Sequence, residues 1–503
     1  MLGLYILYEI LWPWLYLFLT SMVCGWIYHG IFWIVGYLKL RSVIKRKQKE
    51  REEGFRKLEQ QSRFQLNEEH EKILNLSDEE LIKQLQTRRL KATEVLEAFI
   101  AKALKVTRKL NSITEFIPQA EEWARELDEL KEVRGPFHGL PISVKDNCWV
   151  KGMDSSIGLA KYLYQPVAKD SAIVQCYKDL GAVPFCKTNV PQTLLSFGCQ
   201  NPVFGVTKNN LNPDLTPGGS SGGESSLIGA GGSRLGLGSD IGGSVRIPAH
   251  FCGVAGFKGT SQRISGVGFR GSLPNVIGLL GVPGIFAQNA KMLAKASKHM
   301  LEDGKQNKYD PVALPLPWNE QMFSSKRKLR IGYFTSLPYF PLLGDCEEVT
   351  LNAKKALESL GHELVPFEMP DSFKMMDMVF DFGFADKGMH MVENWKNEPI
   401  PPALLVNFLI CKAPAWFRRI LVWIMNARPH TQFLYSQITR RVEDIRAGTE
   451  KSGYMWRRMG DRKAMIEEIK RSVLRNLGVG FYLHLHSHFQ QFQPLKHAWI
   501  LFT

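Results

Sequence analysis

Residues 216–248 read TPGGSSGGESSLIGAGGSRLGLGSDIGGSVRIP, and this stretch carries two serines, Ser220 and Ser244, that are each set among glycines. Glycine has no side chain to hold a substrate away from the backbone. It also permits the positive-φ turns that bring successive N–H groups into one small space. The stretch is therefore typical of an anion site or an oxyanion hole.

Three other interpretations compete for this stretch. A flexible Gly/Ser linker would not need the apolar residues Leu227, Leu235 and Ile241. A nucleotide-binding loop would need Gly-Lys-Ser/Thr or G-x-G-x-x-G, and neither pattern fits. Residues 218–222 do match the G-x-S-x-G elbow of α/β-hydrolases, but the preceding KNNLNPDLTP predicts turns where an elbow needs a strand.

The elbow would also require a downstream acid and histidine. No motif singles out a histidine among His250, His362 and His390. A His-dependent α/β-hydrolase is therefore the weaker hypothesis.

The N-terminus predicts a membrane anchor. No residue from Ile10 to Leu38 is charged, and aliphatic and aromatic side chains predominate there. About 20 apolar residues cross a bilayer as a helix, so we expect one transmembrane helix within residues 1–38. The alternative is a re-entrant or surface-lying hairpin broken at Pro13 or Gly25.

A basic run, KLRSVIKRKQKER, follows the anchor at residues 39–51. Cationic residues beside a span mark its cytoplasmic side, so we expect the rest of the chain to face the cytosol. Residues 39–75 are predicted to be a basic juxtamembrane connector. Much of the net charge of +15 lies in this run, and no evident nucleic-acid-binding module accompanies it, so no nucleic-acid partner is expected.

The remaining chain, 76–480, predicts one large α/β domain. Ser77 is placed to cap a helix, with Glu80 three residues on. Helical and strand patterns then alternate, which favours a mainly parallel or mixed sheet; the predicted elements are strands at 141–144, 182–186, 328–334 and 362–367, and helices near 171–180 and after Asp345. The eight cysteines show no C-x-x-C pair or metal spacing and are expected to be reduced thiols, with no metal site.

A second apolar segment lies at residues 403–428. It is broken by Pro414 and by the cationic Arg418 and Arg419 among aromatic and aliphatic side chains. That mixture favours interfacial helices that contact a membrane surface. A core helix of the α/β domain is the alternative.

A predicted strand that ends in Lys145, within GLPISVKDN, lies upstream of the two serines. A serine nucleophile can be activated by a lysine base instead of a histidine. Three elements follow one another in the chain: this lysine, GGSSGG at 218–223 and GSDIGGSVR at 238–246. With these elements in this order, the chain resembles the amidase signature family over about residues 80 to 477. The resemblance implies that family's fold, a large twisted mixed β-sheet surrounded by helices.

The resemblance also implies roles for individual residues. Ser244 is the expected nucleophile, Ser220 the bridging serine beside a cis peptide, and Lys145 the base, whose buried amine would have a lowered pKa. Asp240 and Arg246 should pair to hold the loop between them. The expected substrate-binding residues are Leu194, Ser220, Ile241, Gly242, Gly243 and Ser244, of which the last four would supply backbone N–H groups to an oxyanion.

Within the family, the anchor and KTNVPQTLLSFGCQNPVFG at 187–205 are most similar to membrane-bound lipid amidases. The expected reaction is hydrolysis of fatty-acid primary amides and N-acylethanolamides, without a cofactor. The expected setting is an endoplasmic reticulum or Golgi membrane, and the resemblance implies a homodimer.

The resemblance stops near residue 478, and we expect residues 481–503 to form an atypical tail. Its His484, His486 and His488 are better explained by strand alternation or an unstructured tail than by a metal site. A catalytically silent membrane-bound product is therefore the alternative to an active amidase.

Overall fold

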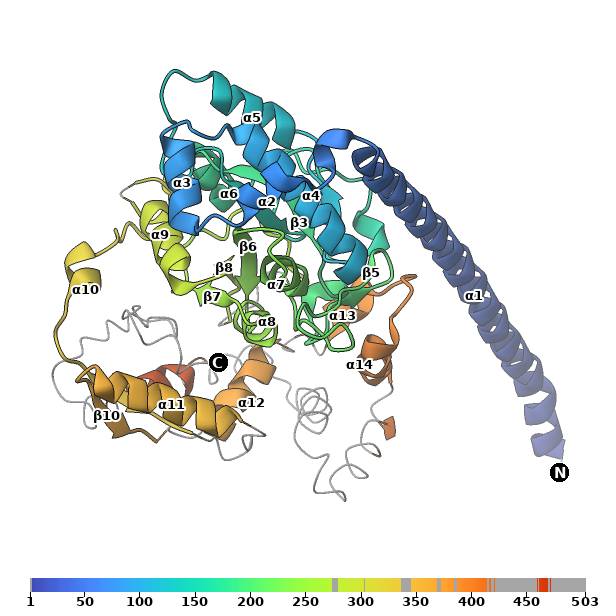
Figure 1. The fold of residues 1–503 in the computed structure, drawn as a ribbon. Helices are drawn as coiled ribbons and strands as arrows, with labels where there is room; N and C mark the ends of the chain where they lie inside the picture. The colour runs from blue at the N-terminus through green and yellow to red at the C-terminus, as the bar shows by residue number, and fades with distance from the viewer. Residues whose placement is uncertain are drawn as a thin grey trace.

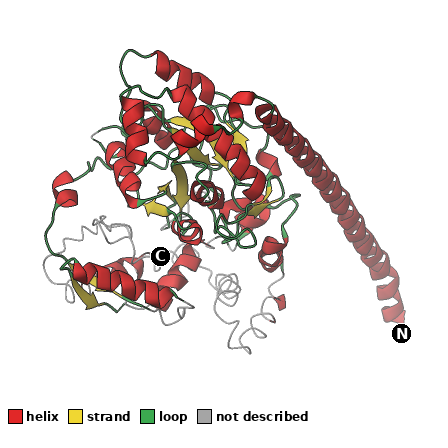
Figure 2. Ribbon diagram, viewed as in Figure 1, coloured by secondary structure: helices red, strands yellow, loops and turns green. Residues whose placement is uncertain are grey.

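Six strands form a mixed sheet at the centre of the domain, in the order β1-β3-β2-β6-β8-β7 (Figures 1 and 2). They are β1 Ile113–Phe116, β2 Pro141–Lys145, β3 Val183–Thr188, β6 Leu235–Asp240, β7 Ala255–Lys258 and β8 Val282–Ala287. The structure is a computed structural model that describes residues 2–273, 279–302, 304–335, 345–368, 372–383, 386, 388–413, 416–417, 420, 459, 461–468 and 471.

The sheet has a parallel centre of three strands, flanked on both sides by antiparallel pairs. Strand β2 runs parallel to both β3 and β6, whereas β8 runs antiparallel to β6 and β7, and β1 runs antiparallel to β3. Every residue of β2 and β3 is buried, which requires cover on both faces of the sheet. The predicted mixed sheet within an α/β domain is thus confirmed.

Helices supply that cover. Helix α4 contacts α5, α7, β2 and β3, while α6 contacts α9 and β3. The helices after α1 are α2 Glu68–Leu74, α3 Asp78–Gln86, α4 Ala92–Leu110, α5 Ala120–Glu129, α6 Ala172–Asp179, α7 Gly222–Gly229, α8 Arg246–Cys252, α9 Ala290–Met300, α10 Glu320–Ser324, α11 Cys346–Ser359, α12 Ser372–Gly383, α13 Met389–Asn394 and α14 Pro402–Lys412.

Two small sheets and three short 3₁₀ turns complete the described elements. The sheets are β4 Gln200–Asn201 with β5 Gly205–Val206, and β9 Arg330–Tyr333 with β10 Glu363–Pro366. The turns are η1 Ser62–Phe64, η2 Ala160–Tyr162 and η3 Gln192–Leu194. The predicted cap of α3 is present, because Ser77 Oγ accepts from Glu80 N at 3.2 Å.

Helix α1 runs without a break from Leu2 to Glu59, and in Figure 1 it projects from the domain as a long rod. The structure therefore differs from a hairpin broken at Pro13 or Gly25. Where the described helices are concerned, none has a segment with the length and hydropathy that a bilayer crossing requires. The predicted transmembrane helix is not confirmed.

The C-terminal half of α1 packs on the domain instead of serving as a loose connector. Ile44 and Phe55 are buried there, and Lys47, Gln48 and Arg51 lie on the same helical face, at intervals of three and four residues. The contact face thus mixes apolar and polar side chains, which hides it from a search for an apolar stripe. Helix α1 thus contributes to the packed part of the described chain from near Ile44 onward.

Polar contacts fix α1 to the edge of the sheet at β1. Arg51 donates to the carbonyl oxygens of Ile113 at 2.5 Å and Thr114 at 3.0 Å, and to Asn111 Oδ1 at 2.7 Å. Lys47 Nζ lies 2.7 Å from Glu115 Oε1 and 3.3 Å from Asp154 Oδ2. These bonds satisfy groups of an edge strand that would otherwise need another partner.

Replacing Arg51 with alanine is expected to lower the free energy of unfolding by about 2–3 kcal/mol, because three charge-assisted hydrogen bonds are lost together. Arg56→Ala is the matched control, since the exposed Arg56–Glu52 pair on the same helix contributes less than about 1 kcal/mol. Urea unfolding of both variants measures the difference. Equal losses in the two variants would contradict the role given to Arg51.

Other predicted segments lie partly or wholly outside the described residues. For the interfacial segment 403–428, the structure describes α14 as far as Lys412 and Ala413 after it, then Trp416, Phe417 and Ile420, which are exposed. The tail at 481–503, with its three histidines, lies outside the described residues altogether.

Candidate active site

Lys145 lies at the end of β2 with its side chain fully buried. Its Nζ is 2.8 Å from Ser220 Oγ, 3.0 Å from Ser239 Oγ and 3.2 Å from the Ser239 carbonyl oxygen. Burial lowers the pKa of the Lys145 amine to about 7, against the opposing charges of Asp240 and Glu224. The amine is therefore substantially neutral at neutral pH and able to accept a proton.

Ser220 lies two residues before α7, and the peptide bond between Gly219 and Ser220 is cis, as expected. A Cβ on Gly219 would overlap the carbonyl oxygen of Ser196. The backbone near Leu194 and Ser196 thus lies against the strand-to-helix connection that carries Ser220. Leu194 itself packs beside an apolar cluster that includes Trp395 and Leu404.

Ser244 is half-buried in the loop that joins β6 to α8. Its carbonyl oxygen accepts from Ser221 N at 3.2 Å, which ties the two halves of the glycine-rich stretch together. Both serines are described, and the structure records no hydrogen bond between their hydroxyl groups. The structure thus brings the segments of Ser220 and Ser244 together through Ser221, without a recorded hydrogen bond between the two hydroxyl groups.

Asp240 organises the loop from within. Its carboxylate accepts from the backbone N–H groups of Gly243 at 2.8 Å and Val245 at 3.0 Å, and from Arg246 Nη2 at 2.9 Å and Nε at 3.1 Å. Burial by itself raises the pKa of the Asp240 carboxyl, but Arg246 and these backbone donors lower it below its usual range. The predicted pairing of Asp240 with Arg246 is confirmed.

That arrangement changes the set of oxyanion donors. The Gly243 N–H was expected to face the substrate, but it donates to Asp240, because the loop wraps around the carboxylate. The N–H groups of Ile241, Gly242 and Ser244 have no recorded acceptor in the described chain. These three form the remaining donor set.

Ser239 and Asn147 were not predicted as site residues. Ser239 accepts from Lys145 and also from Asn147 Nδ2 at 3.1 Å. The register between β2 and β6 pairs Val144 with Leu237 and so places Ser239 near the end of β2. Register between distant strands is not encoded in any local pattern, which is why this contact needed the structure.

Among the described residues, the recorded contacts of Ser220 include no histidine. His250 is exposed on α8 and its ring faces Phe251, and the recorded partner of the Ser220 hydroxyl is Lys145. Over the described ranges, no group of three His, Cys, Asp or Glu side chains could hold a metal ion. The arrangement disfavours the His-dependent hydrolase hypothesis.

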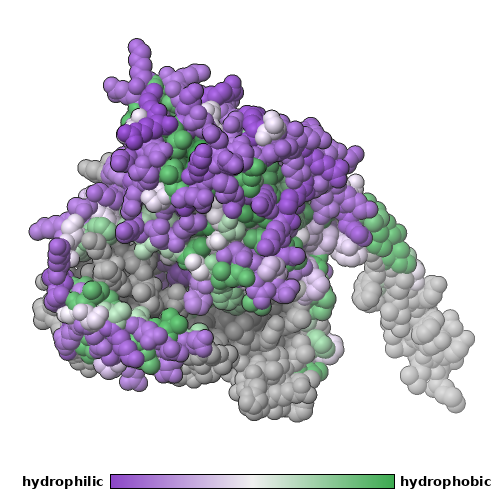
Figure 3. Space-filling view, viewed as in Figure 1, coloured by the Kyte–Doolittle hydropathy of each residue, from purple (hydrophilic) through white to green (hydrophobic). Residues whose placement is uncertain are grey.

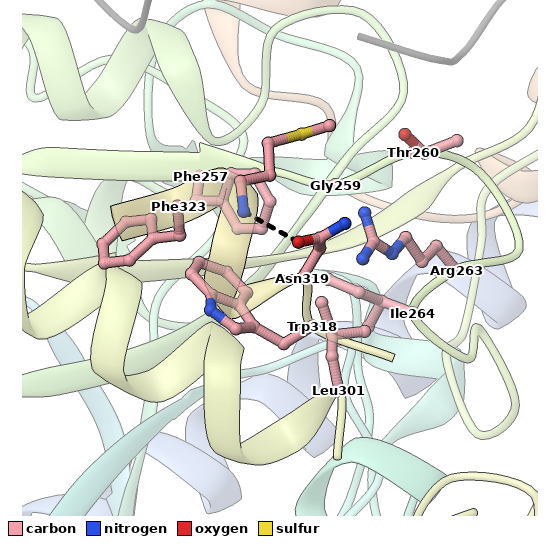
Figure 4. Close-up of a pocket in the computed structure, with 10 residues that line it drawn as sticks. Phe257, Gly259, Thr260, Arg263, Ile264, Leu301, Trp318, Asn319 and Phe323 are labelled. Carbon is pink, nitrogen blue, oxygen red and sulfur yellow. Dashed lines mark hydrogen bonds between the residues drawn. The ribbon is translucent and has the colours of Figure 1, made fainter. Parts of the chain in front are cut away.

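A separate pocket lies away from this chemistry. Figure 4 shows it between the end of β7 and α10, where Phe257, Arg263 and Trp318 are among its lining residues. None of Lys145, Ser220 and Ser244 lines it. The pocket is therefore not the candidate active site.

Comparisons with known proteins identify the class of hydrolases to which this mixed α/β fold belongs. The family described as Amidase matches residues 94–477, so the chain belongs to the amidase family, whose members with the glycine-serine signature are the amidase signature enzymes. It is related to the fatty acid amide hydrolases within that family.

Among relatives, the chain is 37% identical over 385 residues to the chicken (Gallus gallus) protein named "Vitamin D3 hydroxylase-associated protein", covering 76% of this chain and 81% of the relative. It is also 37% identical over 380 residues to "Fatty acid amide hydrolase 1" of Caenorhabditis elegans, covering 74% of this chain and 66% of that protein. The pig (Sus scrofa) "Fatty-acid amide hydrolase 1" is 35% identical, and 61% of its length is covered.

Among solved structures, one titled "Fatty acid amide hydrolase" superposes with a TM-score of 0.64 at 25% identity, covering 76% of this chain and 73% of that one. The chain thus spans four fifths of the chicken relative and less than two thirds of the pig relative.

Proposed function

We propose that the protein hydrolyses fatty-acid primary amides and N-acylethanolamides to free fatty acid and amine, with Ser244 as nucleophile, Ser220 as proton relay and Lys145 as base. The observation that carries this proposal is the 2.8 Å contact between Lys145 Nζ and Ser220 Oγ inside a fully buried environment. A buried lysine beside a serine hydroxyl is poised for proton transfer.

The three contacts of Lys145 Nζ match a neutral amine. A neutral amine has two N–H donors and one lone pair. The Ser239 carbonyl oxygen can only accept, and Ser239 Oγ can accept as well. In the neutral form that the mechanism requires, both N–H groups would be used by Ser239, which would leave the lone pair for the Ser220 hydroxyl.

The reaction follows from this starting state. Lys145 takes the proton of Ser220, Ser220 takes the proton of Ser244, and Ser244 Oγ forms a bond to the amide carbonyl carbon. The proton returns along the same path to the nitrogen, the C–N bond breaks, and the amine leaves. Water then attacks the acyl-enzyme by the same relay and releases the fatty acid.

The transition state needs donors for the carbonyl oxygen as it gains charge. Four N–H groups, those of residues 241–244, were expected to serve. Asp240 accepts from the Gly243 N–H, so the N–H groups of Ile241, Gly242 and Ser244 are the candidates. One such donor contributes about 2.7–4 kcal/mol to catalysis in a protease.

The lipid substrate class is supported by the apolar surface near the site. Leu194 packs in the same cluster as Leu404 of α14, and Leu405 and Leu409 of that helix are exposed. Moving an acyl chain from hydrocarbon into water costs about 0.8 kcal/mol per CH₂ group, so an enzyme held at a membrane avoids that cost. The relatives named for fatty-acid amide hydrolysis point to the same class.

Membrane attachment is part of the proposal. Residues on α1 from Ile31 to Leu38 expose large apolar side chains, which Figure 3 shows in green where the helix leaves the domain. We propose that α1 anchors the enzyme to an endoplasmic reticulum or Golgi membrane, with the catalytic domain in the cytosol. The homodimer stays a prediction from the family resemblance.

Labelling with a fluorophosphonate probe tests the catalytic assignment. We expect the wild-type protein to be labelled at Ser244 and the Ser244→Ala variant to be unlabelled, because the probe reacts only with an activated serine. His250→Ala is the matched control, as this exposed histidine lies on the helix that follows Ser244. Folded wild-type protein that takes up no probe would refute the proposed activity, and loss of labelling in His250→Ala would favour a histidine base.

A further inference from the structure

We propose that Glu224 is a positioning residue that holds α7, and with it Ser220, in register with the strand that carries Lys145. Glu224 lies on α7, four residues after Ser220. The recorded side-chain hydrogen bonds of Glu224 go to Ser143 and Thr188 and to neither Ser220 nor Ser244, so its effect would pass through the elements that it joins. This inference rests on the proposed lysine-serine mechanism.

The Glu224 carboxylate bridges two strands. Its Oε2 accepts from Ser143 Oγ at 2.5 Å, and its Oε1 accepts from Thr188 Oγ1 at 2.7 Å. Ser143 lies on β2 two residues before Lys145, on the same face of the strand. Thr188 lies on β3 directly opposite Lys145 in the strand register. Both hydroxyl donors are thus neighbours of the catalytic lysine.

The surrounding chain is shaped around this carboxylate. Glu224 is fully buried, and a Cβ at Gly236 of β6 would overlap Glu224 Oε2. Ser233 Oγ lies 3.1 Å from Ser143 Oγ and extends the network toward β6. One side chain therefore connects α7 to β2 and β3 while packing against β6.

A buried carboxylate is costly for stability, and well-packed apolar residues can often replace such groups without loss. Its presence between α7, which begins two residues after Ser220, and the strand of Lys145 therefore points to a geometric role. A displacement of about 1 Å at a catalytic pair can cost about 100-fold in rate. Glu224 is placed to prevent such a displacement.

The charge of Glu224 also acts on Lys145. Burial raises the pKa of Glu224 to about 7, while Ser143, Thr188, Lys145 and Lys187 oppose that rise. In turn, the Glu224 carboxylate raises the pKa of Lys145. The charged or titratable groups recorded as interacting with the two residues in the described chain are Lys187 on β3, Asp240 on β6, Asp146 and Cys148 after β2, and Cys186 and Cys199.

Steady-state hydrolysis of oleamide by the full-length protein, measured across pH, tests the role. For Glu224→Ala we expect kcat to fall by about 10- to 100-fold with KM changed by less than about threefold, because Glu224 orients the catalytic pair and binds no substrate. For Glu224→Gln we expect most of kcat to return, since the amide keeps the shape and can still hydrogen-bond both hydroxyls. In the Glu224→Gln variant, the rise of kcat with pH on the acid side of its pH profile (the acid limb) should move to lower pH. The reason is that the negative charge that raised the pKa of Lys145 is gone.

A matched control and a double-mutant cycle separate this role from general destabilisation. Glu115→Gln removes another carboxylate paired with a lysine, on β1, and should leave the acid limb where it is. Thr188→Val should lower kcat in the wild-type background and have little further effect in Glu224→Ala, because its hydroxyl acts through the carboxylate.

The outcomes distinguish this inference from the proposed function. An active, Ser244-labelled wild type whose acid limb does not move in Glu224→Gln, and whose kcat survives Glu224→Ala, would overturn the role of Glu224 alone. Additive effects of Thr188→Val and Glu224→Ala would overturn it too. A wild type that neither hydrolyses oleamide nor reacts with the probe would instead reject the proposed function.

Discussion

Replacing Lys145 with methionine is expected to lower kcat for amide hydrolysis by about 10²- to 10⁴-fold, the usual contribution of a positioned general base. Methionine has nearly the same length and no lone pair basic enough to take the proton of Ser220. The side chain is fully buried, so the apolar replacement fills the same space. Stability should fall as well, because the Ser239 carbonyl oxygen loses its Lys145 donor, so kcat is measured on protein shown to be folded.

The pH dependence makes this result specific. Activity of the wild type should rise with pH through about 7, where burial leaves the pKa of Lys145, because only the neutral amine accepts a proton. The residual activity of Lys145→Met should lack that limb. An unchanged limb in the variant would show that another group is the base.

Stability supplies an independent readout of the same pKa. In the unfolded chain the Lys145 amine returns to its ordinary pKa of 10.5, whereas in the fold it titrates at about 7. Between these two values the unfolded state binds more protons, so the wild type becomes more stable as pH rises through this window. Urea unfolding of Lys145→Met should lack this part of the rise.

Lys187 provides the matched control for the activity profile. It is also a fully buried lysine, on the neighbouring strand, and it donates to the carbonyl oxygens of Asp146 and Cys148. Lys187→Met should cost stability, because those carbonyl groups lose their donor. It should keep the acid limb of the activity profile.

The candidate catalytic residues could be proposed from the sequence because their pattern is local. Glycines flank both serines, and Asp240 and Arg246 enclose the loop between them, so a short stretch specifies most of the site. The strand that ends at Lys145 was also evident, as four consecutive apolar or small residues precede the lysine. The cap at Ser77 was readable for the same reason, since all its partners lie within one turn.

The rest of the site depends on register between segments far apart in the chain. Ser143, Thr188 and Glu224 come from β2, β3 and α7, and no spacing in the sequence brings them together. The packing of α1 was missed because its contact face includes Lys47 and Arg51, which read as part of a solvated basic run. The donation of Gly243 N–H to Asp240 depends on how the loop folds, which composition does not specify.

Replacing Asp240 with asparagine is expected to lower kcat by about 10²- to 10³-fold, as the removal of an oxyanion donor does in a protease. Asn Nδ2 would face the N–H groups of Gly243 and Val245 or the Arg246 guanidinium, where only an acceptor fits. The loop must then reorganise, and the donors of Ile241, Gly242 and Ser244 move with it. The rate of fluorophosphonate labelling should fall with kcat, since both reactions need the same nucleophile and the same loop.

Acid titration separates this electrostatic role from shape alone. The folded pKa of Asp240 is depressed, so its contribution to stability is present above the unfolded pKa and is lost as pH falls through the folded value. The stability difference between wild type and Asp240→Asn should therefore be large at neutral pH and shrink in acid.

Asp128→Asn is the matched control, because Asp128 also accepts from backbone N–H groups, those of Ala92 and Thr93 at the start of α4. It should lower stability without slowing labelling. Equal slowing of labelling in the two variants would mean that Asp240 supports the domain in general, whereas slowing confined to Asp240→Asn follows from a loop folded around one carboxylate. The same carboxylate would then account for both the exposed donors of the loop and the placement of Ser244 beside Ser220.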